Sequence, residues 1–422
     1  MGGTVLNRTL LSICVAGLVS ACATTQSVQI PESPFSERLA EPRLVPVTPG
    51  DPSLTDAQVE MLESRPDFNI YKTLAHHPEL YARWSPLGRI LLNGSTLEAR
   101  HREIVMLRMG WLCQAPYEWS QHARIARDDV GFTEEEIRNI AVGQSAAGWN
   151  DTERTLIQLV DDLRYKATIS DDTWAELKAE FTDQEIMDLL FTAAQYQLVS
   201  MALNSLGVQL DPVLDLYLPT DLPAPALATP AADSPQTIER LPRLNPDEMT
   251  PEQFAAVEHL IREDGSLANI YAVLANHPVL FGPRYDFGSY IKSETSLSPR
   301  IRELLILRTA VLMNADYEWA HHVPIAKDAG LTDEEIAAVL VGPTADIWST
   351  DERFILQAAD DLRREAFITD AVWAGLKASH SDKQLVELIY TVGGYSMTAL
   401  ALNAFDVPID DGLAGLPEGA IQ

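Results

Sequence analysis

Apolar residues along the chain recur at the spacing of helices, and runs that alternate apolar with polar residues are missing. Residues 103–112 are nearly all apolar after an initial glutamate, Glu103, and residues 303–313 repeat this pattern after Glu303. A helix that is apolar on almost every side lies at the centre of a domain. The pattern therefore predicts an all-α fold in which Glu103 and Glu303 each open a buried central helix.

The second half of the chain repeats the first. Residues recur 200 positions later, as Glu103 and Glu303 do, and after a one-residue deletion the offset becomes 199, as for Asp161 and Asp360. The repeated motifs are Asn-Ile-Tyr (69–71 and 269–271), His-Pro (77–78 and 277–278) and Tyr-Glu-Trp (117–119 and 317–319). A match of this length in one order indicates gene duplication. The period is too long for a solenoid unit, so each copy should be a whole domain.

Helix starts are marked in both copies. Thr133 and Glu136 have the spacing of a capping box, and so do Thr332 and Glu335. Another helix should begin near Asn150, where acidic residues follow and suit the helix dipole.

The segments between these patterns give the expected domain boundaries. Residues 218–249 hold seven prolines among Ala, Thr and Ser, which predicts an extended linker. We expect a signal peptide at 1–21, a tether at 22–53, one domain at 54–217 and a second at 250–412.

The N-terminus predicts export. Arg8 is the only charged residue before the apolar residues 10–19, a run too short for a comfortable transmembrane span. Residues 18–22, Leu-Val-Ser-Ala-Cys, resemble a bacterial lipobox. We expect Cys22 to be acylated and to anchor the mature protein to a membrane of the cell envelope. Ala23 favours the periplasmic face of the outer membrane; a plain secretory signal is the alternative.

Charge limits the partners. The chain has 31 Lys and Arg against 61 Asp and Glu, a net charge of -30. Nucleic acid and anionic lipid both need a basic surface, so neither is expected as a partner of the folded domains. The acidity itself indicates a soluble, self-repelling surface.

Candidate chemistry gathers in the segment after the first central helix. Pro116 suits a first helical position, and Asn314 or Asp316 could cap the same helix in the second copy. Glu118 and His122 are then four residues apart on one helix face, where the carboxylate can hold the imidazole tautomer.

Glu103 on the preceding helix would bring a third titratable group to the same pocket. The alternative for Glu103 is a pair with Arg100 or Arg102, and Glu118 with His122 could form an ordinary surface pair. The whole set is kept in both copies while neighbouring positions differ, which favours function. The expected acid-base residues are Glu103, Glu118, His122, Glu303, Glu318 and His322, with aromatic substrate contacts from Tyr117, Trp119, Tyr317 and Trp319.

Other polar residues have structural interpretations. His77 stands where a helix breaks, which favours a cap or a core position. Arg108 and Arg308 lie inside the apolar helices and should pair with an acid such as Asp161 or Asp162. Asn204, near the end of the last long helix, suits a bond to backbone.

The motif of Arg102-Glu103, Tyr117-Glu118-Trp119 and His122, followed by Ala126 and Gly131, resembles the carboxymuconolactone decarboxylase family. Alkylhydroperoxidase D proteins are relatives in that family. The resemblance covers residues 54–212 and 250–409. It implies two tandem AhpD-like all-helical domains, packed as an intramolecular pseudo-dimer that replaces the homo-oligomer interface of single-domain relatives. The pseudo-dimer could itself oligomerise.

The peroxidase branch of the family carries a Cys-x-x-Cys pair before the histidine. Its cysteines map to Ala115 and Glu118, and to Ala315 and Glu318, so disulfide cycling has no thiol pair. Cys113 is out of register, and a buried core position is expected for it.

The decarboxylase branch matches better, because it too has a glutamate four residues before the histidine. The resemblance therefore implies a lyase without cofactor that acts on a small carboxylic or lactone compound by general acid-base chemistry. Three alternatives stay open: a non-catalytic envelope binding module, a peroxidase-like oxidoreductase without the redox cysteine pair, and an iron or manganese site built from Glu103, Glu118 and His122. We expect no metal.

Overall fold

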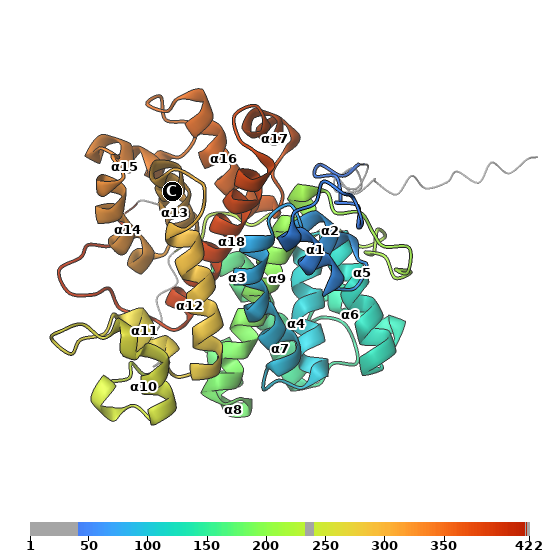
Figure 1. Cartoon of the computed structure of the whole chain (residues 1–422). Coiled ribbons are helices and arrows are strands. Elements are labelled where there is room, and N and C mark those ends of the chain that lie inside the picture. The colour runs from blue at the N-terminus through green and yellow to red at the C-terminus, as the bar shows by residue number, and fades with distance from the viewer. Residues whose placement is uncertain (1–40, 233–239, 418, 420–422) are drawn as a thin grey trace, which may run out of the picture.

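The computed structural model describes residues 41–232, 240–417 and 419 (Figure 1). Its first half contains α1 (Asp56–Glu63), α2 (Asn69–Leu74), α3 (Pro78–Arg89), the π-helical turn η2 (Ile90–Gly94), α4 (Ala99–Leu112), α5 (Pro116–Ile125), the π-helical turn η3 (Ala126–Val130), α6 (Glu134–Val142), α7 (Asp151–Lys166), α8 (Asp171–Glu180) and α9 (Asp183–Leu206). The expected lipidation site, Cys22, lies outside the described residues.

The second half contains the 3-10 turn η4 (Pro246–Glu248), α10 (Pro251–Val257), the 3-10 turn η5 (Glu258–Leu260), α11 (Asn269–Leu274), α12 (Pro278–Ser293), α13 (Pro299–Met313), α14 (Asp316–Asp328), α15 (Asp333–Val341), α16 (Thr350–Glu365), α17 (Asp370–Lys377) and α18 (Asp382–Ala404). Each α-helix of the first half has its counterpart here in the same order. No strand occurs in the described ranges. The predicted all-α tandem repeat is confirmed.

Local sequence signals place most of the helix ends. Both capping boxes form, with Thr133 before α6 and Thr332 before α15, and Asn150 caps α7 as expected. The suggested caps of α14 are wrong. Asn314 ends α13 in the left-handed conformation, with φ 51°, and Asp316 accepts a hydrogen bond from the backbone of Leu416 instead.

The two central helices begin earlier than the apolar pattern suggested. α4 starts at Ala99 and α13 at Pro299, so Glu103 and Glu303 stand in the second turn and do not open their helices. The first turns, 99–102 and 299–302, are exposed or half-buried and carry two arginines each, so the apolar pattern does not extend into them. Both glutamates are consequently enclosed by the core, not placed at its edge.

α9 and α18 lie side by side at the centre of the molecule (Figure 1). Of the helices in the described part of the chain, these two have the length and composition of membrane spans, but their apolar windows are 100% and 94% buried within the protein. Burial of apolar surface, at about 25 cal/mol per Å², makes this pair the core of the junction between the halves.

Reciprocal polar contacts show the pseudo-twofold relation of the halves. Arg164 donates to the backbone oxygen of Arg363 at 2.7 Å, and Arg363 donates to that of Arg164 at 2.8 Å. Asn204 donates to the oxygens of Cys113 and Ala366, the second of which lies in the other half. The side chain thus bonds to backbone, as predicted, and also links the two halves.

Two buried histidine–carboxylate pairs also cross the junction. Nε2 of His77 lies 2.9 Å from Oε1 of Glu387, and Nε2 of His277 lies 3.1 Å from Oδ1 of Asp188. Nδ1 of His77 meanwhile accepts from the backbone of Leu80 and caps α3. His77 is therefore both a cap and a core residue, as its position before a proline suggested.

The connection between the halves is anchored to the second half by backbone hydrogen bonds. Ala228 donates to the oxygen of Arg364 at 3.1 Å, and Ala231 donates to that of Leu312 at 2.9 Å. Described residues of the stretch 218–245 form no α-helix, in keeping with their proline content.

Candidate functional site

α4 and α5 together build the centre of the first site. Pro116 occupies the first position of α5, as predicted, and the helix then turns Glu118 and His122 toward the same side. Nδ1 of His122 lies 2.8 Å from Oε2 of Glu103 on α4. Its Nε2 lies 3.2 Å from Oε1 of Glu118, an ion-pair distance without hydrogen-bond geometry. The imidazole therefore stands between two buried carboxylates.

Two of the structural alternatives for these residues do not hold: the pair of Glu103 with Arg100, and a surface pair of Glu118 with His122. Arg100 pairs with Glu136 and Glu153, each at 2.7 Å, and so is engaged away from Glu103. Glu118 and His122 are only 4% and 6% exposed, so their contact is not a surface pair. The pair with the adjacent arginine forms in the second half, where Nε of Arg302 lies 3.9 Å from Oε1 of Glu303. Because a carboxylate accepts hydrogen bonds and cannot donate them, Nδ1 of His122 carries the hydrogen that faces Glu103.

Burial and the neighbouring charges shift the pKa values of both Glu118 and His122. Burial raises the pKa of Glu118 from 4.5 to about 7; His122 opposes the rise and Glu103 adds to it. Burial lowers the pKa of His122, but the charges of Glu103 and Glu118 and the hydrogen bond to Glu103 outweigh it, so the pKa is raised. Near neutral pH, Glu118 can thus hold or release a proton beside a histidine whose protonated form its surroundings favour.

A cavity of about 270 Å³ opens over Glu118 and His122. The ring of Tyr196, from α9, meets the ring of His122 edge-on at 4.8 Å. Glu103 does not line the cavity and acts on it through His122, so it is a positioning residue. The basic lining residues are exposed or half-buried and stand at the rim: Arg65, Arg89 and Arg124.

The second site repeats this plan with one difference. Nδ1 of His322 lies 2.8 Å from Oε2 of Glu303, and Tyr395 meets the histidine edge-on at 5.0 Å. Both carboxyl oxygens of Glu318 are buried and lack a hydrogen-bond partner. Burial raises the pKa of Glu318 well above 4.5, which Arg284 opposes and Glu303 reinforces. Its burial thus favours the neutral form of this carboxyl group.

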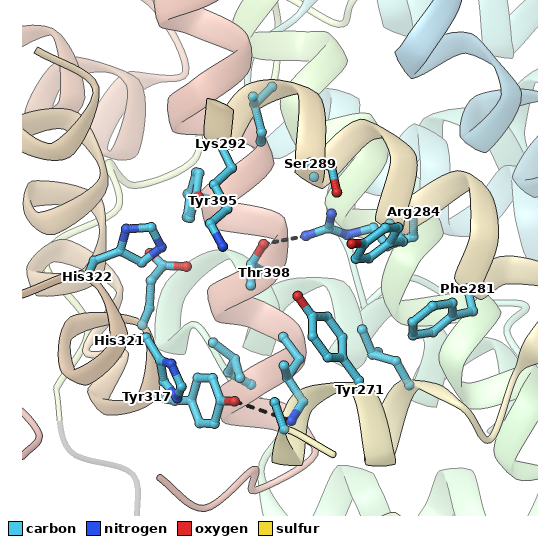
Figure 2. Close-up of a pocket in the computed structure, with 18 of the residues that line it drawn as sticks. Tyr271, Phe281, Arg284, Ser289, Lys292, Tyr317, His321, His322, Tyr395 and Thr398 are labelled. Carbon is cyan, nitrogen blue, oxygen red and sulfur yellow. Dashed lines mark hydrogen bonds between the residues drawn. The ribbon is translucent and has the colours of Figure 1, made fainter. Parts of the chain in front are cut away.

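The second cavity, about 330 Å³, lies between α12, α14 and α18 (Figure 2). Its lining includes Glu318, His322 and Tyr395, as their counterparts line the first cavity. It also includes Arg284, which the sequence gave no reason to single out. The repeat itself offered a signal for Tyr196 and Tyr395, since both stand eight residues before a repeated asparagine.

The four aromatic residues expected to contact substrate divide into two groups. Tyr117 and Tyr317 line the cavities, with their hydroxyls held by Asp211 at 2.5 Å and Asp410 at 3.2 Å. Trp119 and Trp319 do not line them, and the expectation for these two is wrong. Tyr117 and Trp119 project on opposite sides of Glu118 round the helix; Tyr117 lies on the cavity side, and Trp119 packs on Trp111 in the core.

The remaining polar candidates are structural. Arg108 forms a two-point ion pair with Asp161 at 2.7 and 2.9 Å, and Arg308 does the same with Asp360, which confirms the predicted pairing. Cys113 is buried in the core. Across the described ranges, no three His, Cys, Asp or Glu side chains are arranged to hold a metal ion.

Comparison with known proteins gives the family. The model of the "Carboxymuconolactone decarboxylase family" matches the chain twice, at residues 78–162 and 281–361. A solved structure from Agrobacterium tumefaciens, of a protein of unknown function described as a candidate antioxidant defence protein AhpD, shares 21% identity. The similarity covers 33% of this chain and 94% of that one, with a TM-score of 0.31. No curated protein matches the sequence. Each half contains one match to this family model, which includes its glutamates and histidine, so the chain carries two tandem domains of the carboxymuconolactone decarboxylase type.

Proposed function

We propose that the protein is a cofactor-independent lyase that removes carbon dioxide from a small carboxylic or lactone compound by proton transfer. The observation that carries the proposal is the buried histidine between two carboxylates at the floor of a cavity, with one carboxylate of raised pKa facing that cavity. A general acid or base works best when its pKa lies near the working pH.

The chemistry of the step assigns a role to each group. The bond between the substrate carbon and its carboxylate breaks, carbon dioxide leaves, and the electron pair moves into an adjacent carbonyl group. The resulting enolate oxygen is stabilised by the His122 imidazolium. The Glu118 carboxylic acid then gives its proton to the carbon, and water restores that proton, so one proton is consumed in each turnover. Glu103 keeps His122 charged and oriented.

The charge around the cavities supports an anionic substrate. Although the whole chain carries a net charge of -30, three basic residues line each cavity: Arg65, Arg89 and Arg124 in the first, and Arg262, Arg284 and Lys292 in the second. A local positive field in an acidic protein concentrates anions at these two places.

The test is carbon dioxide release by the purified protein against a set of ring-bearing carboxylic and lactone acids. The double variant Glu118→Gln with Glu318→Gln keeps side-chain size and removes the proton donor. We expect kcat to fall by about 10²-fold or more, the usual contribution of a general acid, with ligand affinity nearly unchanged. The matched control is Glu135→Gln, at an exposed position on α6.

Full turnover in the double variant would end the lyase proposal. Ligand binding by the wild-type protein without turnover of any acid in the set would favour the non-catalytic binding module instead. The peroxidase alternative lacks support, since Ala115 and Glu118 stand where the redox pair would be and Cys113 does not line the cavity.

A further inference from the structure

The two cavities share their catalytic side chains but differ in their inner walls. At one position of the wall the first half has Trp84, on α3, and the second has Arg284, on α12. The indole nitrogen of Trp84 donates to Oε1 of Gln195 at 3.2 Å, which closes this end of the first cavity with paired groups. In the second half the same end presents a guanidinium (Figure 2).

The guanidinium of Arg284 is enclosed and has no salt-bridge partner among the described residues. The residue is 7% exposed and lines the cavity. Its Nη2 donates to Oγ1 of Thr398, while Nε is buried without a partner. Of the described acidic residues, Glu318 acts on Arg284 electrostatically, but it forms no salt bridge with the guanidinium. A buried charge without a partner costs several kcal/mol, and an anion bound in the cavity would relieve that cost.

Residues around Arg284 also differ from those at the matching positions of the first half. Thr398 replaces Val199, and its hydroxyl donates to the backbone oxygen of Gly394 while accepting from Arg284. Gly394 in turn replaces Gln195. A side chain at Gly288 would place its Cβ 2.7 Å from Nη1 of Arg284, so the glycine leaves room for the guanidinium. Thr398 thus holds the arginine at a position where the first half has an apolar side chain, and Gly288, which is glycine in both halves, leaves room for it.

Aromatic rings border the same cavity. Phe281 and Tyr285 are stacked, with an interplanar angle of 9°, and Tyr271 meets both rings edge-on at 6.0 and 5.8 Å. Such faces and edges suit a flat ring. Burial raises the pKa of Glu318 well above 4.5, which favours its neutral form beside the ligand, although Arg284 opposes the rise.

We infer that the two pockets bind different ligands, and that the second takes a ring-bearing monocarboxylate whose carboxylate is held by Arg284. This rests on the proposed function only in placing the ligand in the same cavity as Glu318 and His322. The first pocket has Trp84 and Gln195 at that end and no buried guanidinium there to hold the carboxylate.

The experiment titrates the full chain with benzoate and with its neutral isostere benzamide, by calorimetry. Wild type should bind benzoate at one site more tightly than benzamide. Arg284→Met should weaken benzoate binding at least tenfold and leave benzamide binding within about twofold. Arg262→Met, which removes an exposed cation at the rim of the same cavity, should weaken benzoate less than threefold.

A gain-of-function variant guards against a folding defect in Arg284→Met. Trp84→Arg, Gln195→Gly and Val199→Thr together should create a second benzoate site in the first pocket. Unchanged benzoate affinity in Arg284→Met would overturn the inference, and so would an equal loss of benzoate and benzamide. Binding is read without turnover, so the result stands apart from that of the lyase assay.

Discussion

At the residue scale, each site depends on a buried histidine that is fixed by a carboxylate behind it. Glu103 and Glu303 hold Nδ1 of their histidines at the same distance, 2.8 Å, in both halves. The second carboxylate differs between the halves. Glu118 lies at ion-pair distance from its histidine, whereas both carboxyl oxygens of Glu318 are buried without a hydrogen-bond partner. The common feature is thus the positioned imidazole beside a carboxyl group of raised pKa.

The raised pKa of Glu118 predicts a dependence of stability on pH. Below pH 4.5, which is the pKa of this residue in the unfolded chain, Glu118 is protonated in both the folded and the unfolded protein. As the pH rises from there to about 7, the unfolded chain releases a proton that the folded chain retains, so stability is lost. Glu118→Gln cannot ionise. Its melting temperature relative to wild type should therefore be higher at pH 8 than at pH 4.5.

Thermal unfolding at both pH values measures this difference, with Glu135→Gln as the exposed control on α6. An equal offset between Glu118→Gln and wild type at the two pH values would contradict the raised pKa.

At the element scale, helices α9 and α18 determine how closely the two halves approach. They pack side by side (Figure 1) and carry Tyr196 and Tyr395 into the two cavities. Gly393, on α18, faces the side chain of Leu198 on α9, and a Cβ at Gly393 would lie 2.6 Å from Cγ of Leu198. Leu198 is fully buried, so it has no free space into which it can turn.

The substitution Gly393→Ala should therefore destabilise the protein. Alanine favours a helix over glycine by about 0.5–1 kcal/mol, but overpacking of a tight core costs about 1–3 kcal/mol, and the second effect should prevail. Gly282→Ala is the matched control, because this glycine lies in α12 with nothing within 4 Å of its added Cβ. Urea unfolding should show a lower free energy of unfolding for Gly393→Ala than for wild type, and no loss for Gly282→Ala. Equal stabilities of the two variants would refute the tight contact.

At the scale of the whole molecule, the halves form a pseudo-dimer in which each cavity is lined by residues of its own half. The junction helices α9 and α18 each supply lining residues to the cavity of their own half. The buried His77–Glu387 and His277–Asp188 pairs fix these helices to α3 and α12. Burial raises the pKa of both carboxyl groups, yet the hydrogen bonds from the histidines, from Ser296 to Glu387 and from Thr96 to Asp188 outweigh it, so both pKa values are lowered.

These lowered pKa values predict that the junction weakens in acid. The carboxylates stabilise the fold above their unfolded values of 3.8 and 4.5, and this contribution is lost as the pH falls through the lower folded values. Asp188→Asn with Glu387→Gln should cost about 1.5–3 kcal/mol for each charged hydrogen-bonding group at pH 7, and the loss should shrink near pH 3. Denaturant unfolding at both pH values measures it.

The exposed pair between Arg83 and Glu294, which also crosses the junction, provides the comparison. Glu294→Gln should cost at most about 1 kcal/mol. A loss in the double variant that is the same at pH 7 and pH 3 would show that packing, not charge, explains the contribution of the buried pairs.

The sequence by itself determined what depends on near neighbours in the chain. Capping boxes, the Glu118–His122 spacing and the duplication all follow from local order, because helix geometry fixes which residues share a face. The pairing of Arg108 with Asp161 was also predictable, since a buried cation requires an acid.

Only the tertiary structure decided what depends on separate elements meeting. Glu103 contacts His122 because α4 and α5 pack together, and Trp119 is kept from the cavity by the direction in which α5 faces. In the sequence, Arg284 is one of many positions at which the two copies differ. Its enclosure between α12 and α18, beside Thr398, is visible only in the structure. Whether a guanidinium is buried away from a salt-bridge partner depends on how the helices pack, and residue spacing in the sequence does not predict it.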